Sequence, residues 1–237
     1  MWQSDKLGVY ELEVFAPKSP ESSGAIIFLS GFAGTSLQQQ SEFRRVIEAA
    51  GIPVVRPACR ENWWLDVVDP LFDESQTPMA FVRDDLTSWI TKRFGVQPPQ
   101  IALWGVSSGG QGVINLAYRH ALTFPVVAAM APALDFHIAF GRGFAVERIF
   151  SEAEAARQET AILHLHPLNW PKHQFFCCDP NDPSWYSGCE RLASKLRSSG
   201  VPFECDLSTH VSGHDWTYFS AMAPRVMDHL RNGLTRL

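Results

Sequence analysis

A glycine-rich turn between an apolar strand and a helix restricts this chain to few folds. The turn spans Gly105–Gly110 and reads Gly-Val-Ser-Ser-Gly-Gly. Before it, Ile101–Trp104 is a short unbroken apolar run, which is typical of a strand buried on both faces of a parallel sheet. After it, apolar residues recur at helical spacing as far as Ala121. A strand that passes directly into a helix predicts an α/β fold.

The same turn places the hydroxyl of Ser107 at the start of the predicted helix. A nucleophile in this position is held in strained backbone geometry, and Gly105 and Gly109 would allow the close approach of strand and helix that this geometry demands. The free N–H of Ser108 could donate to an oxyanion. The pattern alone also fits a surface serine on a glycine-rich helix entry, but the flanking strand and helix favour a nucleophile.

The rest of the chain repeats the alternation of strands and helices. Further strands are predicted at 10–14, 25–29, 53–56, 125–130, 174–178 and 203–207. Further helices are predicted at 41–50, 77–94, 187–198 and 216–230. Residues 137–173 form an irregular insertion with one helix near 145–158, which we expect to cover part of a site. At 237 residues, 46% of them hydrophobic, the chain is long enough for a single domain over residues 1–237.

Charge and composition argue against several classes of partner. The formal net charge is −5 and no basic run occurs, so we expect neither nucleic acid nor a membrane as a partner. No window approaches the length of a membrane span, and the N-terminus does not resemble a signal peptide. Five cysteines, an odd number, fit buried reduced thiols in a cytoplasmic protein. The oligomeric state stays open, and a homo-oligomer is compatible with the sequence.

A serine nucleophile needs a base within hydrogen-bond reach and a third group that orients this base. In an open α/β sheet, these groups come from loops at the carboxyl ends of the strands. His214 lies in such a loop, after the last predicted strand and before the last predicted helix. A lone histidine is more often a surface or capping residue, and His210 in the same loop is the main rival for the role.

A turn in the last third of the chain offers two carboxylates for the orienting role. Asp179 lies close to the strand end and is suited to capping the turn, whereas Asp182 lies at the tip and can reach the histidine loop. We therefore favour Asp182. Asp135 is a weaker candidate, and Asp215 is too close along the chain to the histidine to hold its ring well.

Chain order supports the same assignment. Ser107, Asp182 and His214 follow one another in the order found in α/β-hydrolases. In that fold a second oxyanion donor comes from the loop after an early strand. The N–H of Phe32, in the loop Leu29–Thr35, is the candidate for this donor.

At these motifs the sequence resembles the α/β-hydrolase esterases of the esterase D type, which include S-formylglutathione hydrolases, feruloyl esterases and antigen 85 mycolyltransferases. The resemblance covers most of the chain and is carried by residues 29–32, 105–112, 179–185 and 213–219. It implies a mostly parallel sheet of about eight strands, flanked by helices, with a short covering insertion.

Two details of the resemblance concern individual positions. In that family the acid turn commonly reads as a glycine, two further residues and then the aspartate. Asp182 therefore matches the catalytic position, and Asp179 stands where the glycine would be. The cysteine-bearing oxyanion loop of S-formylglutathione hydrolases is replaced here by Ala33–Thr35, which argues against a glutathione thioester as substrate.

Four aromatic residues are candidates for the substrate pocket: Trp63, Trp64, Phe136 and Trp185. Two of them, Trp63 and Trp64, are adjacent in a loop where packing does not obviously demand both. They could equally wedge that loop onto the core.

We expect no metal and no cofactor. The histidines at 164, 166 and 173 lack the paired Cys-x2-Cys spacing of a zinc site, and Gly213 prevents a helix from aligning His210 with His214. No phosphate-binding lysine follows the glycine-rich turn.

The sequence favours a serine hydrolase that cleaves small carboxylic or thio esters through an acyl-enzyme on Ser107. One alternative is an acyltransferase that passes the acyl group to an alcohol or a sugar. Another is a domain that only binds a ligand, which the filled nucleophile, base and acid positions argue against.

Overall fold

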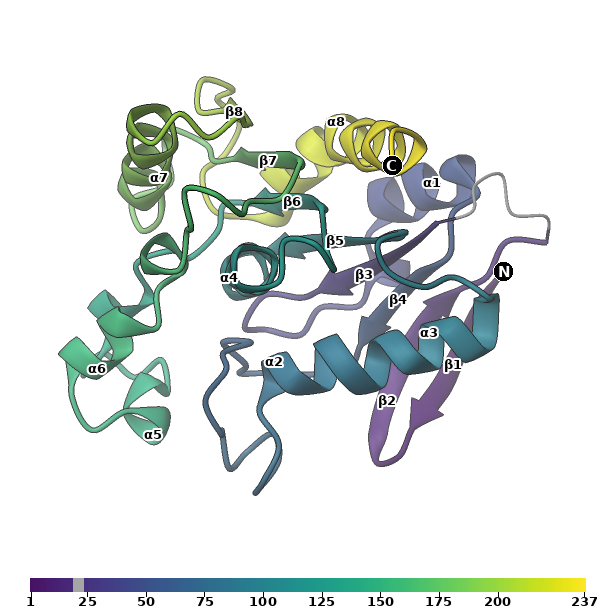
Figure 1. Cartoon of the computed structure of the whole chain (residues 1–237), viewed down its shortest axis with the longest axis horizontal. Coiled ribbons are helices and arrows are strands. Elements are labelled where there is room, and N and C mark those ends of the chain that lie inside the picture. The colour runs from purple at the N-terminus through teal and green to yellow at the C-terminus, as the bar shows by residue number, and fades with distance from the viewer. Residues whose placement is uncertain (19–23) are drawn as a thin grey trace.

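An eight-stranded sheet forms the centre of the structure, a computed structural model that describes residues 1–18 and 24–237 (Figure 1). The strand order is β1-β2-β4-β3-β5-β6-β7-β8. The strands are β1 (Trp2–Leu7), β2 (Tyr10–Phe15), β3 (Ala25–Leu29), β4 (Val54–Pro57), β5 (Ile101–Val106), β6 (Val126–Met130), β7 (His173–Cys177) and β8 (Glu204–Asp206). β2 pairs antiparallel with β1 and with β4, and the other neighbours are parallel. The prediction of a mostly parallel sheet of about eight strands is confirmed.

Helices cover both faces of this sheet (Figure 1). α1 (Ser41–Ala50) and α8 (Trp216–Thr235) pack together on one face. On the other face lie α4 (Ser108–Arg119) and a long helix made of α2 (Pro78–Ala80), a π-helical segment (Phe81–Leu86) and α3 (Thr87–Phe94). Beyond one end of the sheet lie α7 (Tyr186–Ser198) and the insertion that carries α5 (Val146–Ile149) and α6 (Ala153–Gln158).

The ends of the long helix follow from its sequence. The Thr77 hydroxyl accepts a hydrogen bond from the N–H of Ala80 at 3.0 Å, and Pro78 takes the first helical position, where its missing N–H costs nothing. Gly95 ends the helix in the left-handed region with φ of 70°. The boundaries predicted from the cap and the glycine are confirmed.

One strand is absent from the prediction. β1 is an edge strand that pairs with β2 in register from Trp2 opposite Phe15 to Leu7 opposite Tyr10. Its middle is polar and partly exposed, as is common for edge strands, so it carries no apolar alternation. Pairing with an apolar neighbour creates this strand, and periodicity could not reveal it.

The predicted helix at 145–158 is wrong as a single element. α5 ends at Ile149 and α6 begins only at Ala153. Between them Phe150 adopts an extended conformation, with φ of −121° and ψ of 143°, and its buried ring packs near Phe136. Burial of this ring in a small second cluster breaks the helix. The last helix is also longer than predicted and continues to Thr235.

The core lies between the sheet and its helices. Every residue of β3, β5 and β6 is buried. All five cysteines are free thiols, three of them buried, while Cys59 and Cys205 are only partly covered. Among the helices of residues 1–18 and 24–237, none is long and apolar enough to cross a bilayer.

Candidate active site

Ser107 lies on the sharp turn between β5 and α4 with a strained backbone, φ of 54° and ψ of −120°. The glycines beside it permit the close packing of this turn. A Cβ atom on Gly105 would lie 2.3 Å from the carbonyl oxygen of Gly109, and one on Gly109 would lie 2.0 Å from the carbonyl oxygen of Leu29. The steric need for glycine at both positions, expected from the sequence, is confirmed.

Three side chains meet at this turn from three different loops. The Oγ of Ser107 lies 3.0 Å from Nε2 of His214. The Nδ1 of the same histidine lies 2.7 Å from Oδ2 of Asp182. The three residues predicted from the chain order are therefore joined by two hydrogen bonds, although the serine and the histidine are 107 positions apart in the sequence.

Asp182 is held as an anion that faces the imidazole. Its side chain is fully buried, and its Oδ1 accepts hydrogen bonds from the N–H groups of Ser184 and Trp185 at 2.9 and 3.1 Å. Burial alone would raise the pKa of Asp182. The hydrogen bond and charge of His214, together with the two N–H groups, outweigh burial and hold this pKa below its usual value.

Asp179 has a different task in the same turn. Its Oδ2 accepts three backbone hydrogen bonds from the histidine loop, from Val211, Ser212 and Gly213, at 2.7, 2.9 and 2.9 Å. Its Oδ1 accepts the N–H of Asn181 at 2.8 Å. One buried carboxylate thus orders both its own turn and the loop that carries the histidine.

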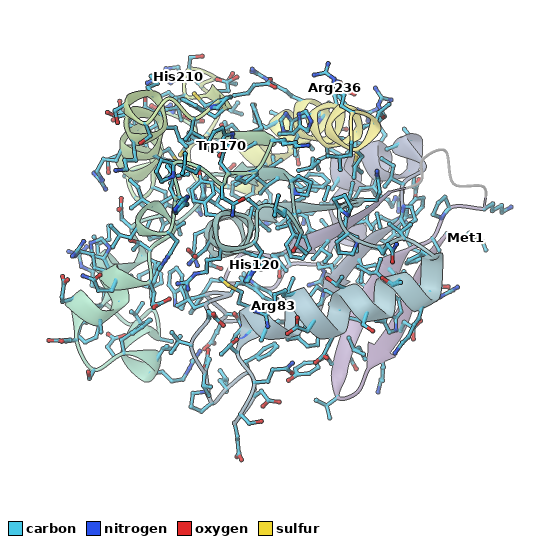
Figure 2. The ribbon with its side chains drawn as sticks, viewed as in Figure 1. Met1, Arg83, His120, Trp170, His210 and Arg236 are labelled. Carbon is cyan, nitrogen blue, oxygen red and sulfur yellow. The ribbon has the colours of Figure 1, made fainter. Side chains whose placement is uncertain are left out.

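The rival residues make other contacts. His210 is exposed on the outside of the molecule (Figure 2). Asp135 forms an ion pair with Arg191. Asp215 accepts hydrogen bonds from the N–H groups of Thr217 and Tyr218 and so caps α8. None of these three is joined to Ser107 by the hydrogen bonds of the described residues.

Two backbone N–H groups beside Ser107 are available to a ligand. Phe32 and Ser108 both line the cavity at the serine, and within residues 1–18 and 24–237 neither N–H takes part in a hydrogen bond. The peptide that carries the Phe32 N–H is fixed because its carbonyl, that of Gly31, accepts the N–H of Gly34 at 2.9 Å. The carbonyl of Ser107 is fixed in turn by the N–H groups of Gln111 and Ala133, both at 3.0 Å.

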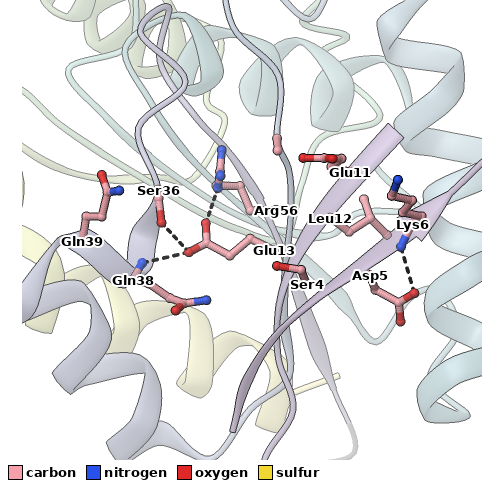
Figure 3. Close-up of a pocket in the computed structure, with 11 residues that line it drawn as sticks. Ser4, Asp5, Lys6, Glu11, Leu12, Glu13, Ser36, Gln38, Gln39 and Arg56 are labelled. Atoms are coloured by element: carbon pink, nitrogen blue, oxygen red, sulfur yellow. Dashed lines mark hydrogen bonds and ion pairs between the residues drawn. The ribbon is translucent and has the colours of Figure 1, made fainter. Parts of the chain in front are cut away.

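The Phe32 loop is also anchored from behind by a buried carboxylate (Figure 3). Glu13 accepts hydrogen bonds from the Ser36 hydroxyl at 2.7 Å and from the Gln38 N–H at 2.9 Å, and it forms an ion pair with Arg56. Burial would raise the pKa of Glu13, but these donors together hold it below its usual value. The ion pair is buried on both sides and ties the end of the loop to β2 and β4.

A cavity of about 370 Å³ opens at Ser107. Its lining residues are Gly31, Phe32, Ala33, Thr35, Trp63, Val106, Ser107, Ser108, Phe144, Ser184, Trp185, His214, Asp215, Trp216 and Phe219. Of the four predicted pocket residues, Trp63 and Trp185 lie in this lining. Trp64 is instead buried in the main core, and its indole N–H donates to the carbonyl of Ser30. Phe136 lies behind Trp63, with ring centroids 5.3 Å apart.

Trp63 links the insertion to the nucleophile helix. Its carbonyl accepts a hydrogen bond from the Gln111 side chain on α4, and its indole N–H donates to the carbonyl of Phe144 at 3.0 Å. The insertion therefore reaches the cavity through Phe144. Phe144 and Phe219 are lining residues that sequence reasoning missed, because nothing local marks an aromatic residue as facing a distant serine.

No group of three or more His, Cys, Asp or Glu side chains in the described part of the chain is arranged to hold a metal ion. The histidines considered as ligands serve other contacts. His164 lies 2.7 Å from Arg119, and His166 accepts the N–H of Leu168 within its own turn.

Comparison with known proteins places the chain in a family. The profile of the family described as "Putative esterase" matches residues 9–225. A search of curated proteins found no match. An S-formylglutathione hydrolase from Staphylococcus aureus has a similar structure, with a TM-score of 0.81 and 13% identity over 98% of this chain and 99% of that one.

Two further structures are similar. An S-formylglutathione hydrolase from Agrobacterium tumefaciens has a TM-score of 0.75 and 16% identity, covering 100% of this chain and 94% of that one. A ferulic acid esterase has a TM-score of 0.75 and 17% identity, covering 98% of each chain. These likenesses show the α/β-hydrolase fold expected from the sequence. The family profile matches most of the chain. The chain therefore belongs to the family described as "Putative esterase" and is a carboxylesterase-type hydrolase.

Proposed function

We propose that the chain hydrolyses carboxylic esters of small molecules through a covalent acyl-enzyme on Ser107. The observation that carries this proposal is the pair of hydrogen bonds from Ser107 to His214 at 3.0 Å and from His214 to Asp182 at 2.7 Å. A serine hydroxyl is a weak nucleophile unless a base removes its proton, and a carboxylate behind that base fixes the orientation of its ring.

The steps follow from this order of groups. The Oγ of Ser107 bonds to the ester carbonyl carbon while His214 takes the proton of the hydroxyl. The carbonyl oxygen becomes an oxyanion. When the carbonyl forms again, the bond to the alcohol breaks and His214 gives its proton to the departing oxygen. Water then attacks the acyl group with His214 as base, which releases the acid and restores the serine. Asp182 stabilises the imidazolium in both halves.

The oxyanion would be held by the N–H groups of Phe32 and Ser108. In a trans peptide the N–H and the C=O point in opposite directions. The carbonyls of Gly31 and Ser107 accept hydrogen bonds from other backbone N–H groups. The N–H group at the opposite side of each of these two peptides, that of Phe32 or of Ser108, is thereby left to face the cavity. Donors fixed in advance stabilise developing charge without reorganisation, and the loss of one donor typically costs about 10²–10³ in rate.

Labelling and turnover of the whole chain test the proposal. A fluorophosphonate should modify Ser107, identified by peptide mass spectrometry, and short 4-nitrophenyl esters should be hydrolysed. Ser107→Ala should abolish both. Ser198→Ala is the matched control, because this exposed serine on α7 bonds only to a carbonyl of its own helix. Turnover that persists in Ser107→Ala, or a label on another residue, would contradict the proposal.

A further inference from the structure

The walls of the cavity at Ser107 are strongly aromatic. Six rings contribute to them: Phe32, Trp63, Phe144, Trp185, Trp216 and Phe219. Phe32 lies at the centre of one wall, with its ring centroid 5.5 Å from that of Trp63 and 6.2 Å from that of Phe144. Apolar and aromatic groups of a ligand are favoured against such walls. A volume of about 370 Å³ leaves room for a compact ligand.

Among the lining residues of the cavity, only Asp215 carries a permanent charge. Among the lining residues, all from the described ranges, none is Arg or Lys. The single carboxylate in the lining is that of Asp215, at the start of α8. Asp215 is exposed, so a ligand with a negative group would give up part of its hydration on entry and meet this carboxylate, while no Arg or Lys of the lining could pair with the ligand.

The positive end of α8 is not available to such an anion. The N–H groups of Thr217 and Tyr218, which would otherwise attract a negative group, already donate to Oδ1 of Asp215 at 2.8 and 3.1 Å. The Ser212 hydroxyl donates to the same oxygen at 2.6 Å. The Ser212 hydroxyl and the two N–H groups hold the pKa of Asp215 below its usual value, so this carboxylate is charged at neutral pH.

We propose that the cavity selects compact, uncharged esters with an apolar or aromatic group, and that Asp215 is the residue that excludes anionic esters. The proposal rests on the proposed function, because it assumes that esters react at Ser107. Repulsion by a charge at the cavity wall opposes binding of the free ester and of its transition state, so it lowers kcat/KM for anionic esters.

Two nearly isosteric esters test this selection. 4-Carboxyphenyl acetate is anionic, and 4-carbamoylphenyl acetate has the same shape without the charge. For the full chain, kcat/KM should be about tenfold or more higher for the carbamoyl ester at low salt. Asp215→Asn should reduce this preference about three- to tenfold, because asparagine caps a helix nearly as well as aspartate but carries no charge.

The matched control is Asp228→Asn, which makes the same chemical change on the exposed surface of the same helix, about 20 Å further along its axis. It should leave the preference unchanged. Added salt at about 1 M should shrink the preference of the unaltered chain toward that of Asp215→Asn, because it screens charges beyond about 3 Å.

The outcomes separate this inference from the proposed function. Equal turnover of both esters by the unaltered chain, or an unchanged preference in Asp215→Asn, would overturn the selection by Asp215. Labelling of Ser107 without turnover of the carbamoyl ester would overturn the substrate class while leaving the nucleophile in place. Absence of both labelling and turnover would instead overturn the proposed function.

Discussion

Two aspartates three positions apart divide the work of one turn. Asp182 bonds to the imidazole of His214, whereas Asp179 accepts three N–H groups from the backbone of the histidine loop. The carboxylate of Asp179 thus sets where the loop lies, and that of Asp182 sets how the ring is turned. Substitution of Asp182 should therefore affect mainly the rate of hydrolysis, and substitution of Asp179 mainly the stability of the fold.

Substitution by asparagine at each position tests this division. Asp182→Asn should lower kcat about 10³–10⁴-fold, because an amide favours the wrong tautomer of the imidazole. Asp179→Asn keeps the shape but weakens charge-assisted hydrogen bonds to a buried acceptor, so it should lower the free energy of unfolding by about 1.5–3 kcal/mol with a smaller loss of kcat. Ester hydrolysis and urea unfolding of both variants measure the two effects. The same kinetic loss in both variants would contradict the division.

The same carboxylates predict how stability depends on pH. Burial would raise the pKa values of Asp179, Asp182 and Asp206, but the donors around each outweigh burial, and all three pKa values lie below the usual one. The unfolded chain therefore binds more protons than the folded one as acid is added. The stabilisation is fully present above the unfolded pKa of about 3.9 and is lost as the pH falls through the folded values.

Urea unfolding between pH 3 and pH 7 measures this loss. The free energy of unfolding of the unaltered chain should fall steeply below about pH 4. The curve for Asp179→Asn should start lower at neutral pH and fall less, because one of the titrating groups is gone. Parallel curves for the two proteins would mean that Asp179 does not contribute to the acid sensitivity.

At the scale of elements, the insertion is attached to the site through Trp63. Its indole N–H donates to the carbonyl of Phe144, and a side chain of α4 holds its own carbonyl. Phe144 lines the cavity while its side chain is about half exposed, so this hydrogen bond helps to fix that part of the wall, together with its ring contact with Phe32 and the ion pair between Arg148 and Asp69.

Trp63→Phe should release that part of the wall. A smaller aromatic ring remains but the indole N–H donor is lost, so hydrogen exchange of residues 141–145 should rise about two- to tenfold, with a higher KM and a kcat that changes less. Trp89→Phe is the control, because this tryptophan of α3 makes its ring contact with Phe94, outside the cavity lining. Unchanged exchange in Trp63→Phe would show that other contacts hold the insertion.

How far the sequence predicts each element depends on what creates that element. Local sequence patterns predict the buried strands, the capped helices and the turn at Ser107. β1 and the break at Phe150 arise from pairing and burial against distant residues, which no local pattern encodes. The same holds for the site: motifs and chain order predict the serine, acid and base, whereas Trp64 turns into the core and Phe144 into the cavity for reasons of tertiary packing.

At the scale of the whole molecule, the sheet has one edge protected by β1. This strand covers β2, whose residues Leu12 and Val14 are buried, and its Trp2 packs on Phe15 with ring centroids 5.4 Å apart. Three strands, β2, β4 and β3, separate β1 from the strand that leads to Ser107. Removal of β1 should therefore change the edge of the sheet without changing the site at Ser107.

Deletion of residues 1–7 should expose the hydrogen-bonding groups of β2 at a new edge of the sheet, which favours pairing with another chain. Light scattering after size-exclusion chromatography should show concentration-dependent association above that of the full chain. Labelling of Ser107 by a fluorophosphonate should persist in the truncated chain. Loss of labelling together with unchanged association would contradict this separation.

The distance along the chain between the serine and its base has a consequence for synthesis. The hydrogen bond between Ser107 and His214 spans 107 residues, and the carboxylate behind the base precedes it by 32. On the proposed mechanism, a nascent chain that has already formed the turn at Ser107 would carry an unactivated hydroxyl until the loop with His214 leaves the ribosome. On the proposed mechanism, reactivity would arise only when the sheet that supports all three loops is complete.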